Sequence, residues 1–455
     1  MYEPGPGATT AETMGRRSRG APLGLQPMVL RGRWLGIVVL IALALVGCGS
    51  QGVPLAGKPG TVERAISVLR ALKPGYLAAR VEQLRGLKFS SIPTFTVLTA
   101  AQAVALGRSS LAFQQPAITQ DTTLMRLTGI VPPSFNMDTY YSILSDGGGA
   151  LAHKVTLVAS PAFANHASAV ENAVEELTIA LDLQNFHPQT YPASSEAGKA
   201  QVSLLEGDAH VIGVEYAKRY GLAVPSTVPP DIASLPFPLE FNIYDEINQG
   251  ADFVTALKAH ANGYTLVNRA LSSDPPRSLA EIISPVRYLR HIAPVSIKMS
   301  GINFFGPRGR YLEVIDQAFD PIDAIDLLAT NARETGPPDT AAAWDGGRVE
   351  LWREGSDTCP GACAHRAFAV LATEWLTPEA ANSFGALLYK RLRAEHGRLV
   401  NTQAWTFPDA EFKLRDGGYA SINIGPEDVA VAWAPTAASA TTLGITVGLG
   451  QKATL

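Results

Sequence analysis

Apolar residues recur at helical spacing near residue 60 and form short, uninterrupted runs further along the chain. The spacing predicts helices at residues 61–73 and 76–87, with Pro74-Gly75 interrupting between them. Residues 94–99 and 150–159 are short and apolar, which is typical of strands, and three glycines precede the second run. Helices and strands together indicate an α+β fold.

The middle of the chain carries the longest helical patterns. They predict helices at 171–186, 199–220, 247–261 and 321–335. A turn rich in proline and serine, residues 187–195, joins the first two helices. Asp320 is the expected N-cap of the last helix, and Pro321 fits its first helical position.

The pattern changes again after Pro337-Pro338. Short apolar runs predict strands at 348–353 and 367–373, and helical spacing predicts a helix at 378–395. Residues 401–455 alternate short apolar runs with glycine, so we expect a strand-rich tail there.

The amino terminus has the pattern of a lipoprotein export signal. Arg31 and Arg33 precede the apolar run 35–46, which is too short to span a bilayer and fits a signal-peptide core. The run leads into Leu-Val-Gly-Cys48, which resembles a bacterial lipobox whose cysteine becomes the lipidated first residue. The alternative is an uncleaved anchor, and either reading places the rest outside the cytoplasmic membrane. Translation is expected to start at Met14 or Met28.

These patterns divide the chain into five expected parts. They are a signal peptide (1–47), a lipidated cysteine with a flexible tether (48–60), a main domain (61–335), a smaller α/β module (336–400) and the tail (401–455).

Composition agrees with a folded exported protein and excludes some functions. Apolar residues make up 46% of the chain, enough for a sizeable core. The 37 basic and 41 acidic residues give a formal net charge of -4, so nothing favours nucleic acid as a partner. No phosphate-binding glycine motif lies between a strand and a helix, so no nucleotide is expected.

Two cysteines remain when Cys48 is assigned to lipid. Cys359 and Cys363 lie close together in a turn-like segment, and in an oxidising setting such a pair most simply forms a local disulfide. His365 invites a zinc interpretation, but structural zinc usually takes four protein ligands. We therefore favour the disulfide.

An acidic pair marks the helix predicted at 171–186, in the order Glu175, Glu176, Leu, Thr, Ile179. Taken alone, this order is typical of a solvated helix edge beside a buried stripe. Zinc proteases of the zincin class have H-E-x-x-H there, because residues i and i+4 share a helix face and hold one Zn²⁺ together. Here Glu175 and Ile179 occupy the histidine places, and isoleucine has no lone pair to donate.

The flanking sequence resembles exported bacterial neutral zinc metallopeptidases of the gluzincin type. Their active helix typically reads H-E-L-T-H-A-L-Q-D-Q and is followed by E-G-D-A. The similar blocks lie at Leu177-Thr178, Ala180-Leu181, Gln184, Phe186, 204–209, 81–89, 97–99, 250–254, 274–278, 288–289 and 344–348. The resemblance spans roughly residues 62–385 in order and implies a zincin-like fold with a smaller C-terminal α/β module.

Carried over residue by residue, the resemblance gives Glu206 the place of the third zinc ligand and Glu176 that of the general base. The other two ligand places are Glu175 and Ile179. Ser284 stands where the family commonly has a histidine. These joint departures argue against peptide hydrolysis, and no cofactor is expected.

A rearranged metal site is the alternative. Glu206 and His210 are spaced i, i+4 and can face Glu175 and Glu176 on the first helix. Three carboxylates and one imidazole would favour Mn²⁺, Ca²⁺ or Mg²⁺ over tightly bound zinc. The simpler interpretation makes His210 an ordinary hydrogen-bonding partner.

Without a metal, clustered carboxylates in a partly buried place repel one another. We then expect raised pKa values in these acids, or a neighbouring cation such as Lys199 or Arg219.

The expected function is that of a catalytically inactive, zincin-like lipoprotein, anchored at the outer face of a bacterial membrane. It would bind a peptide, a protein or an envelope component in its former cleft, with the strand at 150–159 along the cleft edge. The rival is a metal-dependent hydrolase using Glu175, Glu176, Glu206 and His210. A third alternative is a structural surface protein without a ligand.

Overall fold

The computed structural model describes most of the chain from Gly60 onward. The described residues are 60–99, 101–103, 105, 115–137, 139–140, 148–192, 195–223, 232–299, 311–329, 341–354, 367–393, 398–399, 410–414 and 417–448. All of them belong to one unit, Gly32–Leu455. The predicted signal peptide, Cys48, the pair Cys359 and Cys363, and His365 lie outside the described residues.

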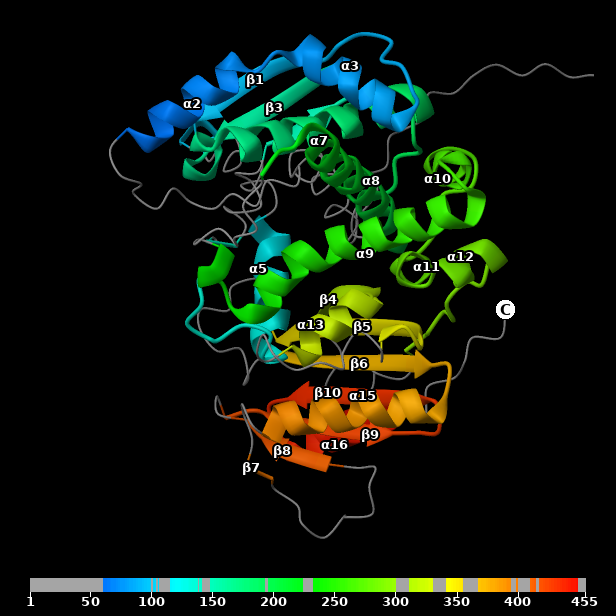
Figure 1. The fold of residues 1–455 in the computed structure, drawn as a ribbon. Helices are drawn as coiled ribbons and strands as arrows, with labels where there is room; N and C mark the ends of the chain where they lie inside the picture. The colour runs from blue at the N-terminus through cyan, green and yellow to red at the C-terminus, as the bar shows by residue number, and fades with distance from the viewer. Residues whose placement is uncertain are drawn as a thin grey trace, which may run out of the picture. The chain divides into compact units, whose positions relative to one another are not determined.

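Helices and two sheets are combined in the described residues, as expected for an α+β protein (Figure 1). The helices are α2 Thr61–Ala71, α3 Pro74–Arg85, α5 Gln115–Leu127, α7 His166–Phe186, α8 Glu196–Tyr220, α9 Phe237–Ala261, α10 Thr265–Leu271, α11 Leu279–Ile283, α12 Pro285–Arg290, α13 Pro321–Leu328, α15 Pro378–Arg391 and α16 Ala437–Gly448. Two short 3₁₀ turns are η1 Pro161–Ala164 and η2 Ile232–Ser234. Within the described residues, no helix combines the length and apolar character that crossing a bilayer requires.

The first sheet has three strands in the order β1–β3–β2. Strand β3, Lys154–Ala159, lies in the centre, parallel to β1, Thr94–Thr99, and antiparallel to β2, Gly149–Leu151. The prediction of one strand at 150–159 is therefore wrong, because the chain reverses between β2 and β3. The turn residues Ala152 and His153 interrupt the apolar run, and the polar His153 was the signal for it.

Local capping explains where the helices begin. Pro74, expected to interrupt a helix, instead occupies the first turn of α3, where a missing N–H costs no hydrogen bond. Helix α7 begins earlier than predicted because the side chain of Asn165 caps it, accepting from the N–H of Ala167. The expected N-cap Asp320 is confirmed, and with Asp323 it forms a capping box on α13. That helix ends at Leu328, earlier than the predicted residue 335.

Helices α8 and α9 cross at very close range. A Cβ on Gly207 would lie 2.1 Å from the carbonyl carbon of Gly250, and one on Gly250 would lie 1.9 Å from the carbonyl oxygen of Ser203. The hydroxyl of Ser203 donates to the carbonyl oxygen of Glu246 at 2.6 Å. The glycine of the E-G-D-A-like block therefore has a packing role, since it lets two helix backbones touch.

The second sheet has seven strands in the order β4–β5–β6–β10–β9–β8–β7, and all neighbours are antiparallel. Its strands are β4 Tyr311–Ala318, β5 Trp344–Glu354, β6 Ala367–Trp375, β7 Arg398–Leu399, β8 Ala410–Lys413, β9 Tyr419–Ile424 and β10 Asp428–Ala434. The sheet draws strands from all three segments expected as main domain, module and tail.

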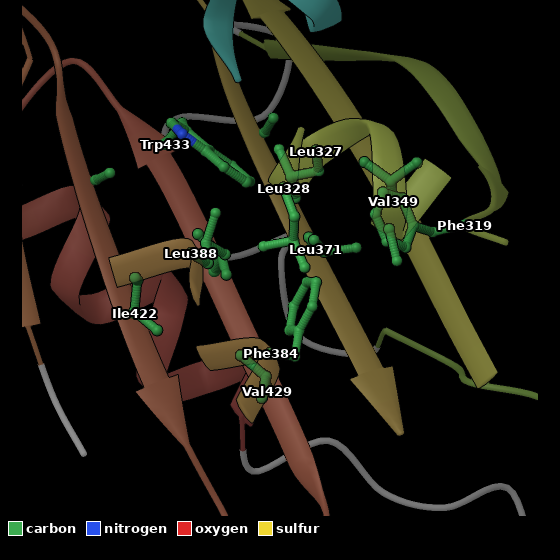
Figure 2. Close-up of a cluster of buried hydrophobic side chains, with 14 of the residues drawn as sticks. Phe319, Leu327, Leu328, Val349, Leu371, Phe384, Leu388, Ile422, Val429 and Trp433 are labelled. Carbon is green, nitrogen blue, oxygen red and sulfur yellow. The ribbon is translucent and has the colours of Figure 1, made fainter. Parts of the chain in front are cut away.

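Alternate residues of the second sheet fill cores on its two faces. Leu371 and Trp433 pack on one face with Phe384 and Leu388 of α15, as Figure 2 shows. On the other face, Val370 belongs to a core that includes residues of α16. Both faces are covered, which is why β6 and β10 read as nearly continuous apolar runs.

Candidate functional site

Helices α7 and α8 bring together the acidic residues that the sequence had singled out. Glu175 and Glu176 lie on α7, and Glu206 and His210 lie on α8. Nδ1 of His210 is 3.1 Å from Oε1 of Glu175. We call these four residues, with Glu171 one turn before Glu175, the glutamate cluster.

Glu175 is held in place by packing as well as by His210. Its side chain is 3% exposed and lies against Gly213 of α8. A Cβ on Gly213 would approach Cγ and Oε1 of Glu175 to 3.0 Å. The absence of a side chain at Gly213 therefore makes the room that Glu175 fills.

Glu176 is fully buried, and among the described residues neither of its carboxyl oxygens has a hydrogen-bond partner. Burial raises the pKa of Glu176 well above its usual value, and the neighbouring carboxylates of Glu206 and Glu175 raise it further.

Burial and neighbouring charges also shift the pKa values of Glu175, His210 and Glu171. Burial raises the pKa of Glu175, while its hydrogen bond to His210 acts in the opposite direction. That hydrogen bond is also the main cause of the raised pKa of His210. Burial and the charge of Glu175 raise the pKa of Glu171 to about 7. The expectation of raised pKa values is met for Glu175 and Glu176.

The sequence suggested Lys199 or Arg219 as the cation near the carboxyls of the cluster, and the structure gives both of them other surroundings. Nζ of Lys199 instead forms ion pairs with Asp320 and with Asp323. Arg219 lies exposed in the last turn of α8. His210, on the same helix, takes the place beside Glu175.

Ile179 occupies the second histidine place and is a core residue. It is 5% exposed and packs in the apolar core that also contains Leu157 of β3 and Leu177 of α7. Ser284, the other departure from the family pattern, lies between α11 and α12. The side chain at position 179 is thus used for packing against the sheet.

The residues of the rearranged metal site come close to one another without forming a recognisable metal centre. Among the described residues, no three His, Cys, Asp or Glu side chains are grouped to hold a metal ion. Nδ1 of His210 faces Glu175, so the imidazole would have to offer Nε2 to a metal.

Sequence reasoning missed a buried ion-pair network next to the cluster. Arg85 of α3 is 2% exposed, and its Nε lies 2.6 Å from Oδ2 of Asp208 while Nη2 lies 3.4 Å from Oδ1 of Asp182. Nη1 donates to Oδ1 of Asn268 at 2.7 Å, and the guanidinium lies over the ring of Tyr264. One arginine thus ties α3, α7, α8 and the start of α10 together. The available signal was an arginine in the block 81–89, an aspartate in the block 204–209, and Asp182 next to the matched pair Ala180-Leu181.

Gln184 anchors the first sheet to the end of α7. Its Oε1 accepts from the backbone and hydroxyl groups of Ser90, both at 2.8 Å. Its Nε2 donates to the carbonyl oxygens of Ser91 and Ala152. Since Ala152 lies in the turn between β2 and β3, this glutamine fixes the β2 edge beside α7.

A second cluster of charged side chains, which we call the Lys199 junction, joins α8, α9 and α13. Lys199 pairs with Asp320 and Asp323 of α13, and Glu196 of α8 and Glu246 of α9 face the same charges. Burial is the main cause of the raised pKa values, about 8 for Glu196 and about 7 for both Glu246 and Asp323. The junction therefore holds more acids than its one lysine can neutralise.

This excess predicts that stability falls as pH rises. Three of the four carboxyls of the junction have folded-state pKa values of about 7 to 8, well above those of unfolded chains. At any pH between the unfolded-state and the folded-state pKa values, the folded state therefore binds more protons than the unfolded state. We expect the free energy of unfolding, measured with urea, to decrease by at least about 2 kcal/mol from pH 5 to pH 8. The Glu196→Gln variant should show a shallower decrease, and equal slopes for variant and parent would contradict this assignment.

Comparisons with protein-family models, with curated proteins and with solved structures found no match to this chain.

Proposed function

We propose that this protein is an exported lipoprotein with a zincin-like, catalytically inactive domain that binds an extended peptide segment. The observation that carries the proposal is the pairing of α7 and α8. These helices bring Glu175 and Glu176 beside Glu206 and His210, while the second histidine place is the core residue Ile179. The contact of α7 with α8 supports the zincin-like assignment, and the missing imidazoles support the loss of catalysis.

We expect no hydrolysis because the two residues at the histidine places of the zincin pattern, Glu175 and Ile179, have packing roles. Ile179 contributes to the core beneath the sheet, and Glu175 is packed on Gly213 and bonded to His210. Without two imidazoles there is no tight zinc site to activate a water molecule. Neither residue can turn towards a metal without disturbing packing.

The edge strand β2 supports the binding of an extended peptide. In the described part of the chain, β2 pairs with β3 on one side, and its Leu151 is 54% exposed. The strand contacts α7 and is held beside it by Gln184. An extended segment can add to such an edge by main-chain hydrogen bonds, with side chains reaching the adjacent helix.

Export and lipid anchoring are proposed from the amino-terminal sequence. The apolar run after Arg31 and Arg33, followed by Cys48 in a lipobox-like order, supports both. Acyl chains on Cys48 would hold the domain at a membrane surface.

The test combines metal content, hydrolysis and peptide binding in the purified protein. We expect no stoichiometric metal after incubation with Zn²⁺, Mn²⁺ or Ca²⁺, no cleavage of fluorogenic peptides, and saturable binding of labelled peptides measured by fluorescence anisotropy. Leu151→Ser should weaken binding. Leu312→Ser is the matched control, because Leu312 lies on the edge strand β4 and is 52% exposed.

Two results would replace the proposal. Stoichiometric metal with cleavage, both lost in Glu206→Ala, would establish the rival metal-dependent hydrolase. Absence of binding for every peptide would favour a structural surface protein.

A further inference from the structure

We infer that the ligand presents a cationic group, the ammonium or guanidinium of a lysine or arginine side chain, to the glutamate cluster. This inference rests on the proposed peptide binding and names the chemical class of peptide that the site selects. It is carried by the buried carboxyl of Glu176 together with the acids that surround it.

Glu176 is a buried polar group with nothing to bond. Its side chain is 0% exposed, and both carboxyl oxygens lack hydrogen-bond partners. Buried polar atoms in folded proteins are nearly always paired, because an unpaired one loses its hydrogen bonds to water without replacement. A ligand that donates hydrogen bonds to this carboxyl would remove that cost.

The surroundings of Glu176 select the charge of such a ligand. Glu206 and Glu175 act on Glu176 as like charges, and Glu175 acts in the same way on Glu171. The imidazole of His210 contacts Glu175. A cation at Glu176 offsets the repulsion among these carboxylates, whereas an anionic group would add to it.

Within the glutamate cluster, Glu175 is buried and held by packing, whereas His210 and Glu171 are accessible to solvent. Glu175 is fixed against Gly213, so its carboxylate has little freedom to turn away. The side chain of His210 is 36% exposed, and Glu171 is partly exposed. Solvent therefore reaches the cluster at His210 and Glu171, and we place the approach of the lysine or arginine side chain to the buried carboxyls on this side.

The test compares two labelled peptides that differ at one side chain. An acetylated pentapeptide with lysine in the middle of four alanines is compared with the same peptide carrying norleucine, and each Kd is measured by fluorescence anisotropy. We expect the lysine peptide to bind the full-length protein about tenfold more tightly or better. In Glu176→Gln the preference should fall to below about threefold, because an amide keeps the shape and removes the charge.

A matched control and a second variant keep the result interpretable. Glu350→Gln removes a glutamate that is also buried, at 5% exposure on β5, and should leave the preference unchanged. Glu206→Gln should lower the preference independently if Glu176→Gln fails to fold. Equal binding of the two peptides, or a preference that survives in both cluster variants, would overturn the inference while leaving peptide binding intact. Absence of binding for both peptides would overturn the inference together with the proposed function.

Discussion

Replacing Arg85 with methionine should lower the free energy of unfolding by about 3–5 kcal/mol. The side chains of Arg85, Asp182 and Asp208 are all 0% exposed, so their charges are shielded from water. Methionine fills much of the same volume and leaves two buried carboxyls facing no cation. The loss of an ion-pair partner inside a protein is costly because the remaining charge stays desolvated.

Denaturant unfolding measures this effect, and two further variants identify its cause. Arg80→Met, on the same helix, removes an arginine that stacks on Tyr76 and Tyr220 near the surface, and should lower stability clearly less than Arg85→Met does. Adding Asp182→Asn and Asp208→Asn to Arg85→Met should recover part of the stability, because no buried charge then remains. A similar cost for the two arginine variants would show that the buried network is unimportant.

Replacing Gly250 with alanine should destabilise the protein by about 2–4 kcal/mol, although alanine is the better helix former. The added Cβ would lie 1.9 Å from the carbonyl oxygen of Ser203, and a backbone atom cannot move aside as a flexible side chain can. Helices α8 and α9 would have to separate. Since α8 also carries Glu206 and His210, we expect peptide binding to weaken as well.

A graded series of glycine variants tests this explanation. Gly75→Ala in α3 meets only Cδ1 of Ile92 at 3.6 Å, an ordinary contact, and should be neutral or stabilising by up to about 1 kcal/mol. Gly213→Ala meets the side chain of Glu175 at 3.0 Å and should fall between the two. Midpoints of thermal unfolding that follow the order Gly75, Gly213, Gly250 would support close packing as the cause, and equal effects would refute it.

Sequence reasoning succeeded where short-range rules decide the outcome. The strand Thr94–Thr99 and the capping of α13 by Asp320 follow from β-branched content and from N-cap chemistry, which act within a few residues. It failed at 150–159, where apolar character outweighed the turn at His153. It also ended α13 too late, because the helical spacing continues past Leu328, whereas the backbone of the next residue, Ala329, is extended.

At the candidate site, too, sequence reasoning succeeded for local features and failed for long-range contacts. The sequence identified the acids of α7 and α8 and expected raised pKa values, because clustered carboxylates repel wherever they meet. It chose Lys199 as a neighbouring cation, but the fold directs that lysine to α13. Arg85 was missed because its partners Asp182 and Asp208 lie 97 and 123 residues further along the chain, so no local pattern links them.

The sequence by itself determined the helix and strand types, the main caps and the absence of imidazoles at positions 175 and 179, since these depend on residue identity and local spacing. The tertiary structure alone decided that Ile179 is a core residue, that Glu176 has no partner and that Gly207 and Gly250 let two helices touch. The physical reason is that burial, desolvation and close packing depend on residues far apart in the chain, and these properties exist only when the helices and sheets are assembled.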